Sequence, residues 1–160
     1  MHGASRRVRV CPRRGTSSSA ARRRSGADLL VVRHARAGDR SAWEGDDRLR
    51  PLDKRGQKQA RALVEALEAF AIARVLSSPY LRCVQTVEPL VASRDVELEL
   101  REELGEGRRE GVALARALAR EPLVLCVHGG LTEAAFGARL RKGETLVVDA
   151  SGRAVRSFRV

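Results

Sequence analysis

Short apolar runs alternate with segments of helical periodicity along most of the chain, and this alternation limits the folds open to it. The apolar runs predict strands at 28–33, 73–76, 96–100, 122–127, 145–148 and 154–158. Apolar residues spaced three and four apart predict helices at 53–71, 79–92, 110–120 and 131–140. This alternation favours an α/β three-layer sandwich with a mostly parallel central sheet and helices on both faces. The last two strands flank the turn sequence Asp-Ala-Ser-Gly and predict a C-terminal β-hairpin.

The chain of 160 residues is long enough for one domain with its own core, which we place at 27–160. Segment 1–26 is rich in Arg and Ser and poor in apolar residues, so we expect a basic, disordered leader outside the domain. A transit peptide and a start codon set too far upstream are the alternatives. No apolar run reaches the roughly 18 residues that a membrane span requires, so no membrane partner is expected. Three cysteines without a recognisable spacing favour a reducing cytoplasm and indicate neither disulfides nor a zinc site.

The formal net charge of +11 is concentrated at one end of the chain. Eight arginines and no acidic residue precede Asp28, so +8 of this charge belongs to the leader and the domain is nearly balanced. The leader lacks the interleaved aromatic residues that stack on nucleic-acid bases. We therefore expect no nucleic-acid partner.

Polar residues with strong chemistry follow three of the predicted strands. "LLVVRHARAG" ends a strand on Arg33 and His34, "SSPYLR" carries Arg82, and "LVLCVHGG" ends the most apolar strand on His128. The carboxyl ends of parallel strands meet at one edge of a sheet, where ligands bind. Ser78 as N-cap and Pro79 as first residue predict a helix start that favours an anion near Arg82. The sequence thus predicts an anion pocket that contains two histidines.

These motifs resemble the histidine phosphatase superfamily (phosphoglycerate mutase-like). "RHA" at 33–35 stands at its Arg-His-Gly signature, and "SSPYLRCVQT" at 77–86 resembles its Ser-Pro-x-x-Arg-x-x-Gln-Thr segment. "VHGG" at 127–130 resembles its second His-Gly, and "RPLDKRGQKQA" at 50–60 its first helix. Ala35 departs from the common glycine. In its small size, the chain is most similar to the small bacterial phosphohistidine phosphatases.

The resemblance implies a metal-independent phosphatase without a cofactor, in which His34 is the nucleophile that forms a phosphohistidine intermediate. It implies that Arg33, Arg82 and His128 bind the phosphoryl oxygens. Nearby cations would lower the pKa of His34 and keep it neutral at pH 7.

The remaining candidate residues lie in two segments. Glu102 and Glu103 follow a strand and are candidate general acids. The segment 36–50 has the length of a binding loop. Four of its residues are either substrate contacts or solvated surface: Arg36, Trp43, Arg48 and Arg50.

Three interpretations of the function remain open. The first is a phosphatase that acts on a phosphohistidine protein or a small phosphate ester; the absence of a clear general acid favours phosphohistidine, whose imidazole leaving group needs less protonation. The second is a nucleotide or sugar-phosphate phosphatase. The third is a poorly active module that binds phosphorylated ligands.

Overall fold

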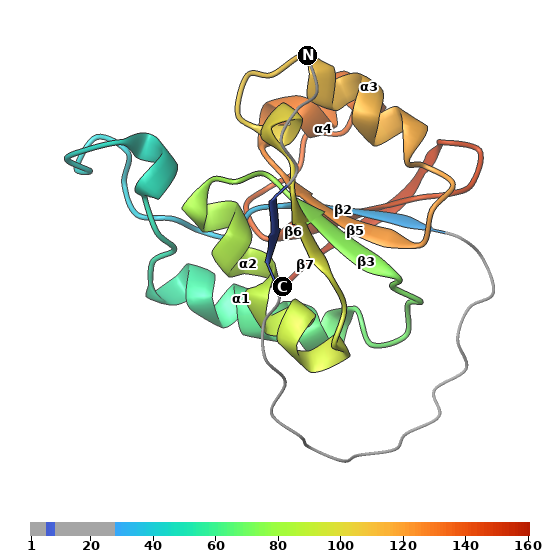
Figure 1. The fold of residues 1–160 in the computed structure, drawn as a ribbon, viewed down its shortest axis with the longest axis horizontal. Helices are drawn as coiled ribbons and strands as arrows, with labels where there is room; N and C mark the ends of the chain where they lie inside the picture. The colour runs from blue at the N-terminus through green and yellow to red at the C-terminus, as the bar shows by residue number, and fades with distance from the viewer. Residues whose placement is uncertain (1–5, 9–27) are drawn as a thin grey trace.

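The computed structural model describes residues 6–8 and 28–160. Within these ranges, seven strands form one sheet in the order β1-β4-β3-β5-β2-β6-β7 (Figure 1). Strands β4, β3, β5 and β2 are parallel, whereas β1, β6 and β7 run antiparallel to their neighbours. The strands span β1 Arg6–Val8, β2 Leu29–Arg33, β3 Arg74–Ser77, β4 Leu98–Leu100, β5 Leu123–Val127, β6 Glu144–Val148 and β7 Ala154–Arg159.

Two helices cover each face of the sheet (Figure 1). Helices α1 (Lys54–Ala66) and α2 (Leu81–Arg94) lie on one side, and α3 (Glu110–Ala117) and α4 (Gly129–Phe136) lie on the other. Two 3-10 turns interrupt the loops, η1 at Asp47–Leu49 and η2 at Glu102–Leu104. The predicted three-layer α/β fold with a C-terminal hairpin is confirmed.

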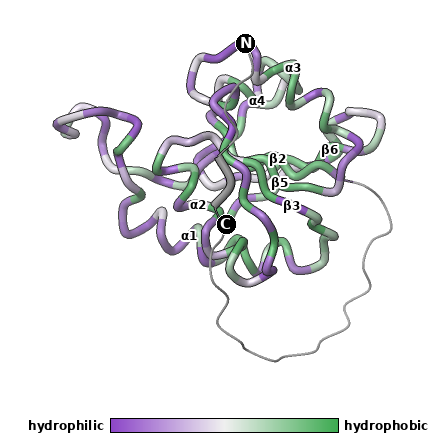
Figure 2. Tube along the Cα trace, viewed as in Figure 1, coloured by the Kyte–Doolittle hydropathy of each residue, from purple (hydrophilic) through white to green (hydrophobic). Residues whose placement is uncertain are grey.

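The core consists of two layers, because successive side chains of a strand point to opposite faces of the sheet. In β2, Leu30 and Val32 pack against α1 and α2, while Leu29 and Val31 pack against the α3 and α4 side. All five residues of β5 are buried. Strands covered on both faces are apolar throughout rather than alternating, as β2 and β5 are in Figure 2. The long loop before α1 is mainly hydrophilic in the same view.

Helix α1 begins beside the end of β2, and its sequence explains the contact. The side chain of Asp53 accepts a hydrogen bond from the Gly56 amide at 2.8 Å and caps the helix. The Asp53 amide donates to the Arg36 carbonyl at 3.0 Å, and its carboxylate pairs with the Arg36 guanidinium at 2.8 Å. The first turn of α1 is therefore attached to the loop that leaves β2.

The predicted start of α2 is wrong by two residues. The helix begins at Leu81, with Tyr80 as N-cap and without a side-chain cap. The Ser78 hydroxyl lies 3.0 Å from Nε2 of His128 and accepts from the Tyr80 amide at 3.4 Å, ahead of the first helical residue. Helix α4 also differs from the prediction: it begins at Gly129 and ends before Gly137, whose φ of 66° places it in the left-handed region that terminates helices.

Part of the leader belongs to the sheet. Arg6–Val8, which the sequence assigned to a segment outside the domain, pair antiparallel with β4. The rest of that segment, including the predicted disorder, lies outside the described residues. In the described part of the chain, no helix is both long enough and apolar enough to cross a membrane.

The close contact between α1 and the end of β2 requires glycine at position 56. A Cβ at this position would lie 1.9 Å from the Arg36 carbonyl oxygen. We expect Gly56→Ala to lower the free energy of unfolding by about 3 kcal/mol, since backbone must move to relieve the overlap. Urea unfolding measures this effect. Gly130→Ala is the control, because no atom lies within 4 Å of its added Cβ; equal midpoints for the two variants would contradict the expectation.

Candidate active site

Three strand ends meet at one edge of the sheet and bring the two described histidines together. The His34 amide donates to the Val127 carbonyl at 3.0 Å, which extends the pairing of β2 and β5 beyond the strand. The Ser78 amide donates to the Cys126 carbonyl at 3.0 Å and joins β3 to the same edge. The rings of His34 and His128 lie edge to face, with 5.3 Å between their centroids.

One ring nitrogen of His34 is engaged and the other is left available. Nδ1 lies 2.8 Å from the Ala35 carbonyl oxygen, which only accepts hydrogen bonds, so Nδ1 carries the proton and donates it. In the neutral ring Nε2 then holds a lone pair. The side chain is 5% exposed and lines a cavity. His34 therefore presents a basic nitrogen to that cavity.

Burial and neighbouring charge keep His34 neutral. Burial is the largest cause and lowers its pKa; the Ala35 hydrogen bond opposes this, and His128, Arg82 and Arg33 add to the lowering. The resulting pKa is about 3, compared with an ordinary value of 6.5. The imidazole is thus in its nucleophilic form at neutral pH.

Arg82 lies in the first turn of α2 and is completely buried. Its guanidinium donates to the Asp47 carbonyl at 2.7 Å, to the Asp47 carboxylate at 3.0 Å and to Glu106 at 3.2 Å. The Asp47 carboxylate also accepts hydrogen bonds from Arg40 and Arg50. Partial burial would raise the pKa of Asp47, but hydrogen bonds from Arg40 and Arg50 and the charge of Arg82 hold it well below its usual range.

Arg33 reaches the site from the α4 side of the sheet. Its guanidinium donates to the Leu140 carbonyl at 2.6 Å and packs against the first turn of α4. A Cβ on Gly129 would lie 2.8 Å from the guanidinium carbon, which explains the glycine directly after His128. Buried nitrogens of three side chains have no hydrogen-bond partner in the described structure: Arg33 Nε, Arg82 Nε and His128 Nδ1.

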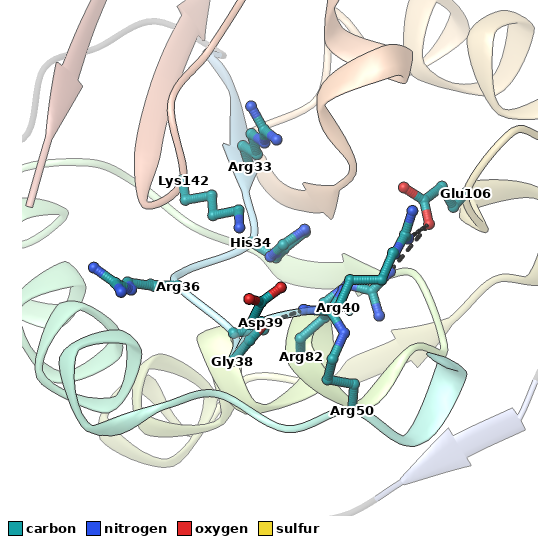
Figure 3. A pocket seen from close by; sticks show the side chains of 11 residues that line it. Arg33, His34, Arg36, Gly38, Asp39, Arg40, Arg50, Arg82, Glu106 and Lys142 are labelled. Atoms are coloured by element: carbon teal, nitrogen blue, oxygen red, sulfur yellow. Dashed lines mark hydrogen bonds and ion pairs between the residues drawn. The ribbon is translucent and has the colours of Figure 1, made fainter. Parts of the chain in front are cut away.

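The cavity above His34 has a volume of about 620 Å³. Figure 3 shows basic side chains on both sides of the histidine, with Arg36 and Lys142 on one side and Arg82 and Arg40 on the other. Partial burial lowers the pKa of Lys142, and the nearby Arg33, Arg50, Arg36 and Arg82 lower it further. Two acidic residues, Asp39 and Glu106, line the cavity. Six basic residues line it as well: Arg33, Arg36, Arg40, Arg50, Arg82 and Lys142. Such a cavity favours anions.

Side chains that the sequence analysis gave no role hold this geometry. The hydroxyl of Thr86 accepts a hydrogen bond from the Ala35 amide at 2.9 Å and donates to the Arg82 carbonyl at 2.6 Å. The carbonyl oxygen of Gln85 accepts from the Leu52 amide at 2.8 Å. The Gln-Thr pair of the motif at 77–86 thus connects α2 to the loop after His34.

The structure separates the predicted substrate-binding residues into two groups. Arg36 and Arg50 line the cavity. Trp43 does not line it; its ring nitrogen donates to the Asp46 carbonyl and its side chain is 36% exposed. Arg48 also lies outside the cavity and pairs with Glu102 at 3.1 Å.

The candidate general acids lie outside the cavity as well. Glu102 pairs with Arg48, and Glu103 pairs with Arg101 at 2.9 Å. Of the three glutamates in this segment, Glu106 is the one that lines the cavity, together with Asp39 from the loop after β2, and it contacts Arg82 and Arg40. Its position between two glycines in "LGEG" was the available signal, because the chain turns there. Among residues 6–8 and 28–160, no group of three or more His, Cys, Asp or Glu side chains is arranged to hold a metal ion.

The fold and the cavity define the class: an α/β protein with an anion cavity at the strand ends that is lined by His34 and several arginines. His128 contacts the ring of His34 but lines a different cavity. The histidine phosphatase superfamily (branch 1) matches residues 29–125, more than half of the chain. The chain therefore belongs to this superfamily, as its motifs indicated.

Individual relatives differ in what they act on. An 8-oxo-(d)GTP phosphatase from Mycolicibacterium smegmatis (strain ATCC 700084 / mc(2)155) is 54% identical over 67 residues, which are 42% of this chain and 21% of that protein. The chain thus matches about a fifth of this relative's length.

Two solved structures share the fold. One is the protein histidine phosphatase SixA complexed with tungstate, with a TM-score of 0.67, 21% identity, and coverage of 82% of this chain and 96% of that chain. The other, from Agrobacterium tumefaciens and assigned provisionally as the phosphohistidine phosphatase SixA, has a TM-score of 0.66, 20% identity, and coverage of 83% and 97%.

The low pKa of His34 predicts a titration that can be observed directly. We expect its ring to remain neutral, with the proton on Nδ1, from about pH 7 to about pH 5 in an NMR titration. The unfolded chain binds this proton near pH 6.5, whereas the folded chain binds it only near pH 3. His34 therefore lowers the free energy of unfolding as pH falls through that interval. In His34→Gln, the free energy of unfolding should decrease less over the same interval. A His34 titration midpoint near 6.5 would contradict this account.

Thr86→Val tests the support of the His34 loop. The valine removes the hydroxyl and leaves the buried Ala35 amide without its acceptor, so we expect a loss of about 2 kcal/mol in unfolding free energy. We also expect kcat to fall about tenfold or more, because Ala35 orients His34. Thr86→Ser keeps the hydroxyl and is the matched control. If Val and Ser behave alike in urea unfolding and in kcat, the hydroxyl has no such role.

Proposed function

We propose that the protein is a phosphatase in which Nε2 of His34 attacks phosphorus and forms a phosphohistidine intermediate. The observation that carries this proposal is a neutral, singly engaged imidazole that faces a cavity lined by six basic residues. A nucleophile needs an available lone pair, and a phosphoryl group needs positive charge around its oxygens. The cavity offers both within one site.

In the first step the Nε2–P bond forms while the bond from phosphorus to the leaving group breaks, and the bonding electrons depart with that group. In the second step water attacks phosphorus, the N–P bond breaks, and phosphate is released with His34 restored. Arg33, Arg82 and His128 would bind the phosphoryl oxygens and stabilise charge in both transition states. Their three unpartnered buried nitrogens support this assignment. These side chains supply the positive charge that the reaction needs, so we expect hydrolysis to proceed in the presence of a chelator.

Different observations favour different substrate classes. Glu102 and Glu103 are engaged by arginines outside the cavity, which favours a leaving group that needs little protonation, such as the imidazole of a phosphohistidine protein. The similarity to the 8-oxo-(d)GTP phosphatase favours the second candidate, a nucleotide phosphatase. A small phosphate or sugar-phosphate ester would need a proton donor, for which the carboxyl groups that line the cavity are Asp39 and Glu106.

His34→Ala tests the proposed function. We expect the intact chain to hydrolyse a phosphohistidine protein or p-nitrophenyl phosphate in chelator, and the variant to lose activity about a thousandfold or more. Acid-labile, base-stable phosphate should be trapped on the intact chain and not on the variant. Arg61→Gln, on the exposed side of α1, is the control that should keep the parent rate.

The alternative of a binding module has its own signature. An intact chain that binds phosphate or tungstate but turns over neither substrate would contradict the enzymatic proposal. Equal rates for the intact chain and His34→Ala would contradict the role of this histidine.

A further inference from the structure

A second basic cavity adjoins the first. It has a volume of about 500 Å³ and is lined by Arg36, Arg55, Gln59, Lys142 and Arg159. Arg36 and Lys142 also line the cavity above His34, so the two cavities share a wall. Both shared residues lie on the side of His34 away from Arg82 in Figure 3. The anion cavity therefore continues in that direction.

The cations of this second cavity are only partly compensated by acids: Arg159 lies opposite Glu144 across β6 and β7, and the charges of Arg159 and Lys142 act on Glu144 and Asp39. Within residues 6–8 and 28–160, no carboxylate forms an ion pair with Arg55, Lys142 or Arg159; Arg36 pairs with Asp53. This differs from the Arg82 side, where Asp47 and Glu106 accept from the guanidinium groups. An anion that enters the second cavity meets positive charge without displacing a carboxylate from three of its four cations.

Gln59 fixes the backbone beside these cations. Its carbonyl oxygen accepts from the Arg36 amide at 3.0 Å, and its amide nitrogen donates to the Lys142 carbonyl at 3.3 Å and to a terminal carboxylate oxygen of Val160 at 2.9 Å. One side chain of α1 thus bonds to the backbone of Arg36 and Lys142 and to that of Val160, the residue after Arg159. A Cβ on Gly143 would lie 2.5 Å from the Gln59 amide nitrogen, so the turn before β6 is shaped around this contact. These contacts organise the cluster before a ligand arrives, which lowers the cost of binding.

We propose that the second cavity binds a further phosphoryl group of the substrate, and, resting on the proposed function, that the substrate is an organic di- or triphosphate whose terminal phosphoryl group is attacked by His34. A substrate with a single phosphoryl group would leave Arg55 and Arg159, the two cations that the second cavity adds, without an anionic group to bind. A phosphate chain places the next phosphoryl group one bridging oxygen away, on the path from His34 past Arg36 and Lys142.

The chemistry of the leaving group agrees with this substrate class. When Nε2 of His34 bonds to the terminal phosphorus, the anhydride P–O bond breaks and its electrons remain on the bridging oxygen. The departing group is a phosphate, whose second pKa is about 6, so it leaves at neutral pH without a proton donor. Arg55 and Arg159 would stabilise the charge that develops on it. The reaction then needs neither Glu102 nor Glu103.

Binding of inorganic tripolyphosphate and of orthophosphate to a chain that carries His34→Ala tests the subsite separately from catalysis. At fixed ionic strength, we expect calorimetry to show about tenfold or tighter binding of tripolyphosphate, since each added charged contact contributes on that scale. Adding Arg55→Gln and Arg159→Gln should reduce this preference to about twofold. Arg61→Gln with Arg120→Gln removes the same charge from exposed positions outside both cavities and should keep the preference.

Three outcomes would overturn the inference: equal binding of the two probes, a preference retained in Arg55→Gln/Arg159→Gln, or an equal loss in the control pair. None of them depends on turnover, so a failure here is distinguishable from a failure of the phosphohistidine test. In the chain with His34 intact, release of phosphate from a nucleoside triphosphate and from tripolyphosphate distinguishes the two sources of a phosphate chain. Hydrolysis of either, reduced in Arg55→Gln/Arg159→Gln, supports the subsite.

Discussion

A completely buried guanidinium group is the constraint around which the site is built. Burying the charge of Arg82 is costly unless nearby acceptors compensate it. Asp47 supplies a carbonyl and a carboxylate, and Glu106 supplies a second carboxylate. Since Asp47 also binds Arg40 and Arg50, the group that compensates one buried arginine places two more at the cavity. The loop between β2 and α1 is thus attached to α2 by these ion pairs as well as by the hydrogen bonds of Gln85 and Thr86.

The reactivity of His34 and the affinity of the cavity for anions have the same physical origin. Burial removes the solvent that would stabilise an imidazolium, and the surrounding cations oppose a further positive charge. The same cations repel one another, as the lowered pKa of Lys142 indicates. A phosphoryl group relieves that repulsion. Binding of substrate and activation of the nucleophile are therefore two results of one charge distribution.

The residues at the strand ends were predictable, whereas their partners were not. Arg33, His34 and His128 follow apolar runs, and the direction of parallel strands takes them to one edge of the sheet. Glu102, Glu103 and Glu106 share one short segment, and only the conformation of η2 and the following turn decides which carboxylate lines the cavity. Asp47 lies in a loop without periodicity, so no pattern distinguishes it from its acidic neighbours. Gln59 appears as an ordinary polar residue of a helix, because its partners at 36, 142 and 160 are distant in sequence.

The sequence by itself determined the layered α/β architecture, the hairpin at the end of the domain and the placement of histidine and arginine after apolar strands. These features follow from hydrophobic periodicity and strand direction, which are local properties of the chain. The tertiary structure decided which nitrogen of His34 is available, which carboxylates engage Arg82, and that a second group of cations adjoins the first. Those properties depend on contacts between loops that are far apart in sequence, and no local pattern specifies such contacts.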